Sequence, residues 1–202
     1  MTTISMITTF AKSELMTPRE ITRKYEDPLN LIWIHAAKCC GIRVIRDAEV
    51  FAAWDGIDTL RIGQNETLDP DDSLAQMIFH ELCHALVEGP AAQQQPDWGL
   101  VFGNQEHEKH EHACLRLQAA LADPYQLREF LASTTDYREY YDQLPADPLA
   151  NQADPATGLA LAGYERATSG PWAEPVRQAL ERTQALKALV QHLVNENSIW
   201  SV

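Results

Sequence analysis

The chain has 202 residues, 45% of them hydrophobic and 22% charged, which is typical of a globular protein and excludes a disordered or fibrous one. Its net charge of −13 repels phosphates, so no broad electrostatic binding to nucleic acid or to an anionic membrane is expected. We expect a single domain over residues 1–202, with a core at 42–123 and a helical part at 124–202.

The N-terminal residues 1–26 show weak periodicity, which predicts a loose arm or a short helix. No apolar run there or later has the length of a signal sequence or of a membrane span, so we expect a cytoplasmic protein. The first firm element is a helix at 28–40, because Asp27 can cap it, Pro28 suits its first position and Gly41 suits its end.

Three short strands are predicted after this helix, near 42–46, 50–54 and 57–62. β-Branched and aromatic residues dominate these stretches, as is typical of strands. The dipeptide Asp55-Gly56 lies between the second and the third strand and is a strong signal for a tight hairpin.

The next helix is predicted in the segment DPDDSLAQMIFHELCHALVEGP, with Asp69 as its cap, Pro70 at its start and Gly89-Pro90 at its end. Its residues are apolar nearly all round, so the helix should cross the core. The polar exceptions are His80, Glu81 and His84.

The second half of the chain is predicted to be mostly helical. Residues 90–104 should form a loop, and a helix follows in QEHEKHEHACLRLQAALADP, ending before Pro124. Further helices are predicted in YQLREFLAS, in DYREYYDQL and from about residue 173, with a Pro- and Ala-rich connection at 145–171. The fold class is therefore α+β: a small antiparallel or mixed sheet packed on the HELCH helix, with a mostly helical C-terminal half.

The HELCH motif carries the candidate chemistry. His80 and His84 lie four residues apart, which places them on one face of a helix where both can bind one metal ion. Glu81 projects to an adjoining side, where it can deprotonate a metal-bound water as a general base. Burying these three groups unpaired would be costly, and a metal removes that cost. The alternative is a cluster of core side chains that satisfy one another.

A catalytic zinc site needs a third protein ligand and an open position for water. The helix at 105–123 offers several candidates. Its apolar stripe, at about 100° per residue, runs through Ala113 and Leu117, and His110 falls at the centre of that stripe. We therefore predict His110 as the third ligand. The alternatives are a solvated, charged turn without a ligand, or one of the neighbouring side chains Glu106, His107, Glu108 and Glu111.

A strand, an HExxH helix and a second helix with a ligand, over about residues 57–123, resemble the layout of the zincin metallopeptidases. Among these, ImmA/IrrE-like peptidases carry the pattern ExxA[DN] on the second helix. HEHAC matches it at Ala113 and places His110 where their third ligand, a glutamate, lies; Cys114 stands where they have Asp or Asn. The sequence HELCHA also resembles SprT-type zinc peptidases. These resemblances imply a zinc ion and a peptide or protein substrate.

A weaker resemblance points to another reaction class. The spacing of Gly89, Asp97 and Gly99 after His84 is similar to that in elongation factor P hydroxylase, an HExxH protein that modifies a protein side chain. In this alignment Glu108 matches a glutamate of that family, and the resemblance implies iron.

We therefore expect a metal-dependent hydrolase of the zinc metallopeptidase type. A peptide or protein substrate would lie along the edge strand near 57–62, Zn²⁺ would polarise the scissile carbonyl, and Glu81 would activate the water. One alternative is an Fe²⁺-dependent protein hydroxylase. Another is a non-enzymatic, metal-stabilised binding or regulatory module, whose site a fourth protein ligand would close.

Overall fold

The computed structural model describes residues 20–134, 136–150 and 152–202. Helix α1 (Pro28–Cys39) begins as predicted, because the Asp27 carboxylate accepts hydrogen bonds from the backbone N–H groups of Leu29 and Asn30. Residues 20–27 contain no helix, and the rest of the predicted N-terminal arm lies outside the described residues.

A mixed three-stranded sheet follows, formed by β1 (Arg43–Arg46), β2 (Ala52–Trp54) and β3 (Thr59–Ile62). The strand order is β1-β3-β2, with β1 parallel and β2 antiparallel to β3. The predicted hairpin is confirmed, since the Asp55 carboxylate accepts hydrogen bonds from the next backbone N–H groups and Gly56 has a φ of +78°. The expectation of an edge strand at 57–62 is wrong: β3 is central, and β2 is an edge strand.

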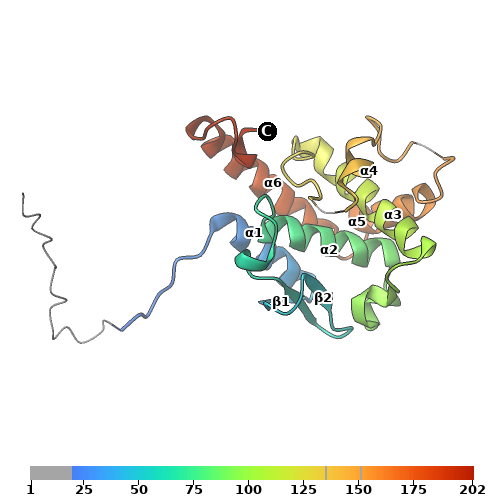
Figure 1. Cartoon of the computed structure of the whole chain (residues 1–202), viewed down its shortest axis with the longest axis horizontal. Helices are drawn as coiled ribbons and strands as arrows, with labels where there is room; N and C mark the ends of the chain where they lie inside the picture. Colours follow the sequence, from blue (N-terminus) through green and yellow to red (C-terminus); the bar gives the residue numbers. More distant parts are fainter. Residues whose placement is uncertain (1–19, 135, 151) are drawn as a thin grey trace, which may run out of the picture.

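Helix α2 (Leu74–Glu88) carries the HELCH motif. Its N-cap is Ser73 and not Asp69, because Ser73 and Gln76 form a reciprocal capping box. All its residues except His80 and Glu88 are buried, as the apolar pattern predicted. Figure 1 shows α2 in the middle of the molecule, where it contacts α1 and β3 as well as α3 and α5.

Helix α3 (Gln105–Ala122) follows a loop with two short 3-10 turns, η2 (Ala92–Gln94) and η3 (Pro96–Gly99). The side chain of Asn104 caps α3 by accepting a hydrogen bond from the His107 backbone N–H. The loop and the helix therefore match their predicted ranges closely.

The predicted helix at 125–133 is wrong. Turn η4 (Asp123–Tyr125) ends at Gln126, whose φ of +58° is left-handed and stops helical continuation. The segment is held instead by side chains of α2 and α3, since Ala132 O accepts a hydrogen bond from Gln76 Nε2 and Leu131 O accepts one from Gln118 Nε2. Helix α4 (Arg138–Asp142) then lies inside the segment predicted to be helical.

The predicted connection at 145–171 is wrong in its second half, which forms helix α5 (Thr157–Ser169). This helix is rich in small residues and packs closely on α2 and α3. A Cβ at Gly163 would lie 2.9 Å from Leu117 Cδ2, so a larger residue there would have to displace the Leu117 side chain. Helix α6 (Ala173–Val190) starts where it was predicted and holds α1 through a hydrogen bond from Trp33 Nε1 to Thr183 Oγ1 (3.0 Å).

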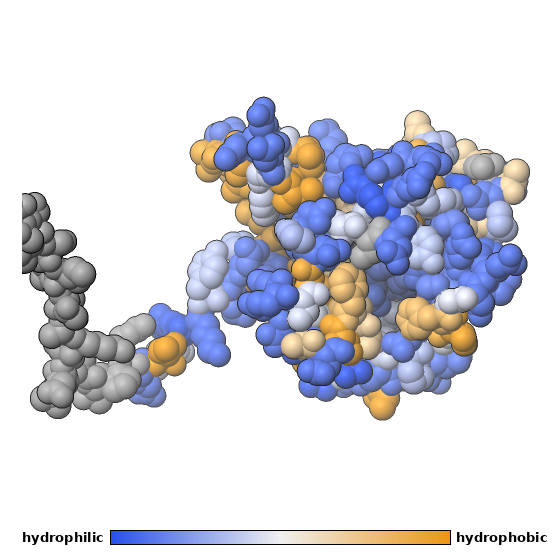
Figure 2. Space-filling model, viewed as in Figure 1, coloured by the Kyte–Doolittle hydropathy of each residue, from blue (hydrophilic) through white to orange (hydrophobic). Residues whose placement is uncertain are grey.

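One large apolar core draws residues from α1, the sheet, α2, α3, α5 and α6, which confirms the α+β class with a helical C-terminal half. The surface is mostly polar, with apolar residues gathered in a few patches on the face shown in Figure 2. Within the described ranges, no helix combines the length and the hydropathy needed to cross a membrane.

Candidate metal centre

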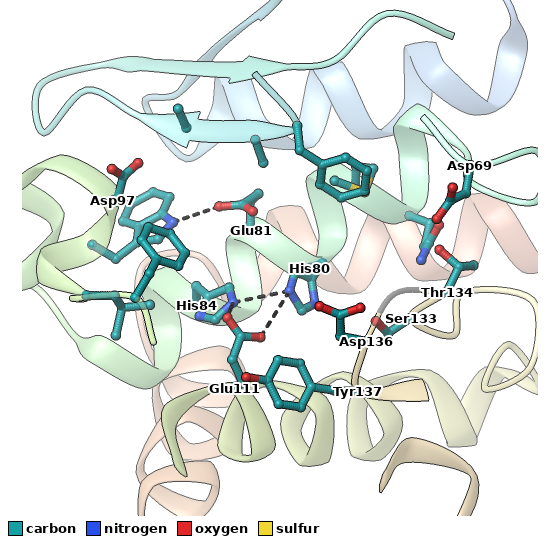
Figure 3. A pocket seen from close by; sticks show the side chains of 18 residues that line it. Asp69, His80, Glu81, His84, Asp97, Glu111, Ser133, Thr134, Asp136 and Tyr137 are labelled. Atoms are coloured by element: carbon teal, nitrogen blue, oxygen red, sulfur yellow. Dashed lines mark hydrogen bonds and ion pairs between the residues drawn. The ribbon is translucent and has the colours of Figure 1, made fainter. Parts of the chain in front are cut away.

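A cleft of 670 Å³ opens beside α2. Residues of β2 line one side, α3 and the segment around Tyr137 line another, and the loop with η3 contributes a third. All three polar residues of the motif, His80, Glu81 and His84, face this cleft (Figure 3). The motif therefore lies where a substrate can reach it.

The two histidines of the motif present the same ring nitrogen to one point. His80 Nε2 and His84 Nε2 lie 3.1 Å apart, and the rings meet edge to face at 89°. Metal–nitrogen bonds of about 2.0–2.1 Å at a tetrahedral angle place two nitrogens about 3.3 Å apart. The pair therefore has the spacing of two ligands of one ion.

Glu111 of α3 faces this pair. Its Oε1 lies 3.4 Å from His84 Nε2 and its Oε2 lies 3.7 Å from His80 Nε2, and only 9% of the residue is exposed. Two imidazoles and a carboxylate from facing helices thus surround one space. Among the alternatives considered from the sequence, Glu111 is the carboxylate that the structure brings to the histidines.

His110, predicted as the third ligand, lies elsewhere. Its Nδ1 is 2.6 Å from Glu88 Oε2, and within the described part of the chain no hydrogen bond or ion pair joins it to His80 or His84. Of the other candidates, Glu106 and Glu108 face solvent, with side chains that are 73% and 57% exposed, whereas His107 is buried beside Glu111.

The prediction that His110 is the third ligand fails for a geometric reason. The apolar stripe that contains His110 and Leu117 faces α5, as the close approach of Gly163 to Leu117 shows. A second buried row on α3 faces the motif, because α3 packs against two helices and not one. The residues of this row are His107, Glu111, Cys114 and Gln118. Their spacings of four, three and four residues place them on one face of the helix, and this spacing is visible in the sequence.

Gln118 fixes the orientation of the His80 ring. Its amide nitrogen donates to Leu131 O, so its carbonyl Oε1 is left to accept a hydrogen bond from His80 Nδ1 at 2.9 Å. With the proton on Nδ1, the lone pair of His80 Nε2 points toward His84 and Glu111. Such a partner on the far nitrogen is typical of a histidine that binds a metal.

Cys114 lies beside Nδ1 of His80 and not beside Nε2, the nitrogen that faces His84. His80, His84 and Cys114 have ligand atoms within 4.8 Å of one another, so this group can hold a metal ion. The thiol, however, is 3.6 Å from Nδ1, the nitrogen that Gln118 already binds. Burial, with the neighbouring Cys83, raises the pKa of this thiol well above its usual range, whereas metal binding requires the thiolate.

The charges of the site are strongly coupled. Burial lowers the pKa of His84, but the carboxylates of Glu111, Glu81 and Glu88 outweigh it and raise that pKa to about 9. Burial likewise raises the pKa of Glu111, but His84 and His80 outweigh it and lower that pKa to about 2. Both shifts favour an imidazolium–carboxylate pair of His84 and Glu111 in the metal-free site, whose proton a bound cation would have to displace.

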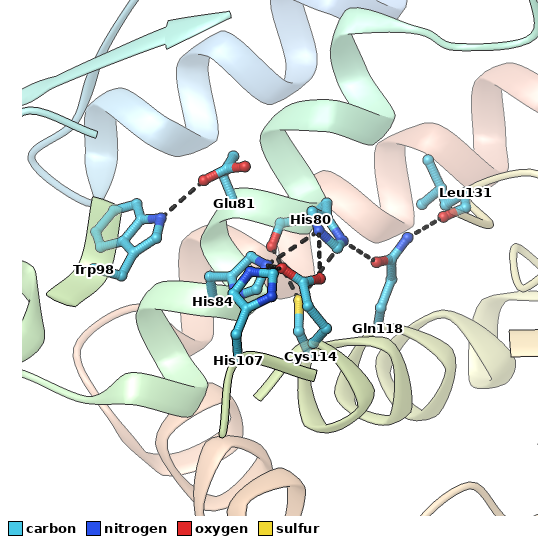
Figure 4. A network of polar contacts seen from close by, with 9 residues as sticks. His80, Glu81, His84, Trp98, His107, Cys114, Gln118 and Leu131 are labelled. Carbon is cyan, nitrogen blue, oxygen red and sulfur yellow. Dashed lines mark hydrogen bonds and ion pairs between the residues drawn. The ribbon is translucent and has the colours of Figure 1, made fainter. Parts of the chain in front are cut away.

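Glu81 stands apart from the ligand group and has its own partner (Figure 4). Trp98 Nε1 donates to Glu81 Oε2 at 2.8 Å, and the Trp98 ring stacks on Trp54 at 4.5 Å. Trp98 and the preceding Asp97 both have left-handed φ angles, 57° and 48°, which is a strained conformation for two consecutive non-glycine residues. Nothing in the sequence analysis singled out Trp98.

The strained turn is held by hydrogen bonds to β2. The Asp97 carboxylate accepts from the Trp54 backbone N–H at 3.2 Å, and Trp54 Nε1 donates to Gln93 O at 2.9 Å. These bonds and the Trp54–Trp98 stack keep the indole N–H directed at Glu81. The loop therefore positions the carboxylate of the motif from outside α2.

Comparisons of the chain with models of protein families, with curated proteins and with solved structures found no match. The site is accordingly interpreted from its own residues and their geometry.

Proposed function

We propose that the chain is a metal-dependent hydrolase of the metallopeptidase type, in which His80, His84 and Glu111 bind the ion and Glu81 is the general base. The observation that carries this proposal is that all four groups line one cleft, while Glu81 is held by Trp98 outside the ligand group. Two imidazoles, one carboxylate and an adjacent base are the parts that a hydrolytic zinc site requires.

Glu111 replaces His110 in this proposal as the third ligand. Its oxygens face the Nε2 atoms of both histidines at 3.4 and 3.7 Å, whereas His110 pairs with Glu88. It is also a better third donor than Cys114, because a buried thiol with a raised pKa must first lose its proton. Two histidines and a glutamate suit Zn²⁺, the ion expected from the resemblance to zincins.

A divalent ion bound here supplies a Lewis acid that makes a bound water more acidic and polarises a carbonyl. Glu81 accepts the proton of the attacking water and returns it to the leaving amine, while the C–O bond forms and the C–N bond breaks. Because Trp98 occupies Oε2, we assign the proton transfer to Oε1. Trp98 therefore acts as a positioning residue for the base.

The substrate we propose is an extended peptide segment lying along β2. This strand is at the edge of the sheet, and Ala52 and Ala53 line the cleft together with the preceding Phe51. Asp97 already binds the Trp54 N–H, so an added strand would pair with the outer edge at Ala52. The proposal moves the substrate from the central strand at 57–62 to the opposite side of the hairpin.

The test is hydrolysis of a peptide library by the zinc-loaded protein, read by mass spectrometry, for the parent and for Glu81→Gln. The variant should bind zinc like the parent and lose turnover by about 100-fold or more, because it lacks the base. The matched control is Glu106→Gln, an exposed carboxamide change on α3, which should cleave at the parental rate. Cleavage by Glu81→Gln at the parental rate would overturn the assignment of the base.

A second candidate is an iron-dependent protein hydroxylase, favoured by the same ligand set. Two histidines and one carboxylate around open positions are also the ligands of non-haem Fe²⁺ oxygenases. Glu108, on which the hydroxylase resemblance depended, is 57% exposed and takes no part in this set. Oxygen consumption by the Fe²⁺-loaded protein, with no peptide cleavage by the zinc form, would select this function over hydrolysis.

A further inference from the structure

His107 is a buried histidine beside the proposed metal site that has no role in the three-ligand proposal. It lies in the first turn of α3, where the Asn104 cap fixes its backbone N–H, and its ring packs against Phe102 at 4.8 Å. Only 9% of the residue is exposed. Its Nε2 is buried and has no hydrogen-bond partner among the described residues.

The position of that nitrogen relates it to the ligand group. His107 Nε2 lies 3.2 Å from Glu111 Oε1, the oxygen that also faces His84 Nε2 at 3.4 Å. The contact lacks hydrogen-bond geometry, so Glu111 leaves the nitrogen unsatisfied. Leaving a buried ring nitrogen without a partner is costly, and a cation would recover that cost.

The four side chains form two pairs, one on each of two facing helices. His80 and His84 are an i,i+4 pair on α2, and His107 and Glu111 are an i,i+4 pair on α3, so each helix presents two donors from adjacent turns. The distances between neighbouring donors are 3.1, 3.2, 3.4 and 3.7 Å. Adjacent donors of one six-coordinate ion with bonds of about 2.1 Å lie about 3 Å apart, which is close to the 3.2 Å between His107 Nε2 and Glu111 Oε1.

We infer that His107 is a fourth protein ligand, and that the ion is held by three imidazoles and one carboxylate: His80, His84, His107 and Glu111. This inference rests on the three-ligand site proposed above and changes its chemistry. Four protein ligands leave no room for water on a four-coordinate zinc ion. An ion that takes five or six ligands, such as Fe²⁺, Mn²⁺ or Co²⁺, retains one or two positions.

The consequence concerns which ion supports activity. With His107 bound, the open positions needed for hydrolysis exist only on an ion of higher coordination number, or on zinc that expands to five ligands. His107 therefore sets the metal preference of the site, and the ring of Phe102 holds it against the cleft.

The inference is tested with Co²⁺ as a spectroscopic probe on the full-length chain. Co²⁺ is titrated into the parent, His107→Ala and the control His110→Ala, which removes a neighbouring histidine that contacts Glu88 instead. Imidazole ligands are counted by X-ray absorption, and affinity is measured by competition with a chelator. Unfolding of the metal-free proteins is followed by circular dichroism to show that each variant folds.

We expect the parent to bind one Co²⁺ with three imidazoles, and His107→Ala to bind it with two imidazoles and roughly 100-fold more weakly. His110→Ala should match the parent in both readings. Two imidazoles in both the parent and His107→Ala would overturn the inference, even if affinity fell, because His107 would then only position Glu111. Failure of the parent to bind Co²⁺ would instead overturn the proposed metal site itself.

Discussion

Two buried polar clusters lie on different sides of helix α3, and they differ in how completely their polar atoms are paired. In the first, Arg116 donates Nε to Tyr140 Oη at 2.6 Å, Nη1 to Pro148 O at 2.5 Å and Nη2 to Asp154 Oδ2 at 2.8 Å. Tyr140 Oη also donates to Asp154, and the His112 ring stacks on Tyr140 at 3.6 Å.

The second cluster consists of His80, His84, His107 and Glu111, and its polar atoms are incompletely paired. The buried atoms His84 Nδ1 and His107 Nε2 have no hydrogen-bond partner among the described residues. The nitrogens that do approach one another are Nε2 of His80 and Nε2 of His84, which lie 3.1 Å apart.

The difference separates a structural cluster from a binding site. Buried polar groups in folded proteins are nearly always satisfied, and the Arg116 cluster follows this rule with protein atoms alone. The histidine cluster leaves His84 Nδ1 and His107 Nε2 unpaired among the described residues, and a cation between the two helices would bind the second of these nitrogens. Incomplete pairing, more than burial or charge, makes the second cluster the candidate binding site.

The largest expected effect comes from removing the carboxylate of the histidine cluster. Glu111→Ala should weaken Zn²⁺ or Co²⁺ binding by more than roughly 100-fold, because the site loses a ligand and its only anionic donor. Calorimetric titration measures the change. The control is Glu108→Ala, which alters an exposed glutamate three residues away and should bind metal like the parent.

The opposite result would indicate that the Cys114 thiol is the third ligand. If Glu111→Ala binds metal like the parent while Cys114→Ser does not, the ion is held by His80, His84 and Cys114 instead.

The Arg116 cluster should respond in stability and not in metal binding. Arg116→Ala leaves Asp154 without its cationic partner and should lower the free energy of unfolding by about 3 kcal/mol. Arg138→Ala is the matched control: its side chain is 37% exposed, and its loss should cost about 0.5 kcal/mol or less. Urea denaturation of the metal-free proteins measures both values. A large loss of metal affinity in Arg116→Ala would show that the two clusters are not independent.

The orientation of His80 by Gln118 should have a smaller effect on metal binding. Gln118→Leu removes the acceptor for His80 Nδ1 and should weaken binding by roughly 10- to 100-fold. Gln76→Leu is a close control, because Gln76 also donates to a carbonyl of the same segment, that of Ala132, but no hydrogen bond joins it to the His80 ring within the described chain. Equal affinities for the two variants would argue that Gln118 contributes packing alone.

The smallest effect concerns the pH dependence of stability through Asp154. Burial raises its pKa, but hydrogen bonds from the Ala156 backbone N–H, Arg116 and Tyr140 outweigh this and lower the pKa below its usual value. A carboxyl with a lowered folded pKa stabilises the fold above its unfolded pKa, and this contribution is lost as the pH falls through the folded pKa. Asp154→Asn should therefore flatten the acid side of the unfolding profile. An unchanged profile would show that Asp154 does not contribute to the pH dependence of stability.

The sequence predicted the elements whose signals are local. Proline and glycine at its two ends predicted α1, and Asp55-Gly56 predicted the β2–β3 hairpin. The apolar pattern around HELCH predicted that α2 is buried, although its cap proved to be Ser73. The convergence of His80 and His84 followed from their spacing on one helix.

The parts that depend on tertiary packing were not predictable in this way. A single apolar stripe on α3 predicts that His110 faces the motif. Helix α3 packs against both α2 and α5, however, and this stripe faces α5, so the ligand-facing residue is Glu111 and not His110. The sequence of α5 predicts a connection and not a helix, because its small residues suit close packing and give only a weak helical periodicity. Trp98 reaches Glu81 from a strained loop, and such contacts leave no periodic signal.

The most direct test of the account is the identity of the atoms that hold the ion. X-ray absorption at the metal edge, on the full chain with one equivalent of Zn²⁺ or Co²⁺, should show one bound ion with nitrogen and oxygen neighbours and no sulfur. This result is predicted because the Glu111 oxygens face the Nε2 atoms of His80 and His84, whereas the Cys114 thiol lies beside Nδ1 of His80. Sulfur in the first coordination sphere, or no bound ion at all, would contradict it.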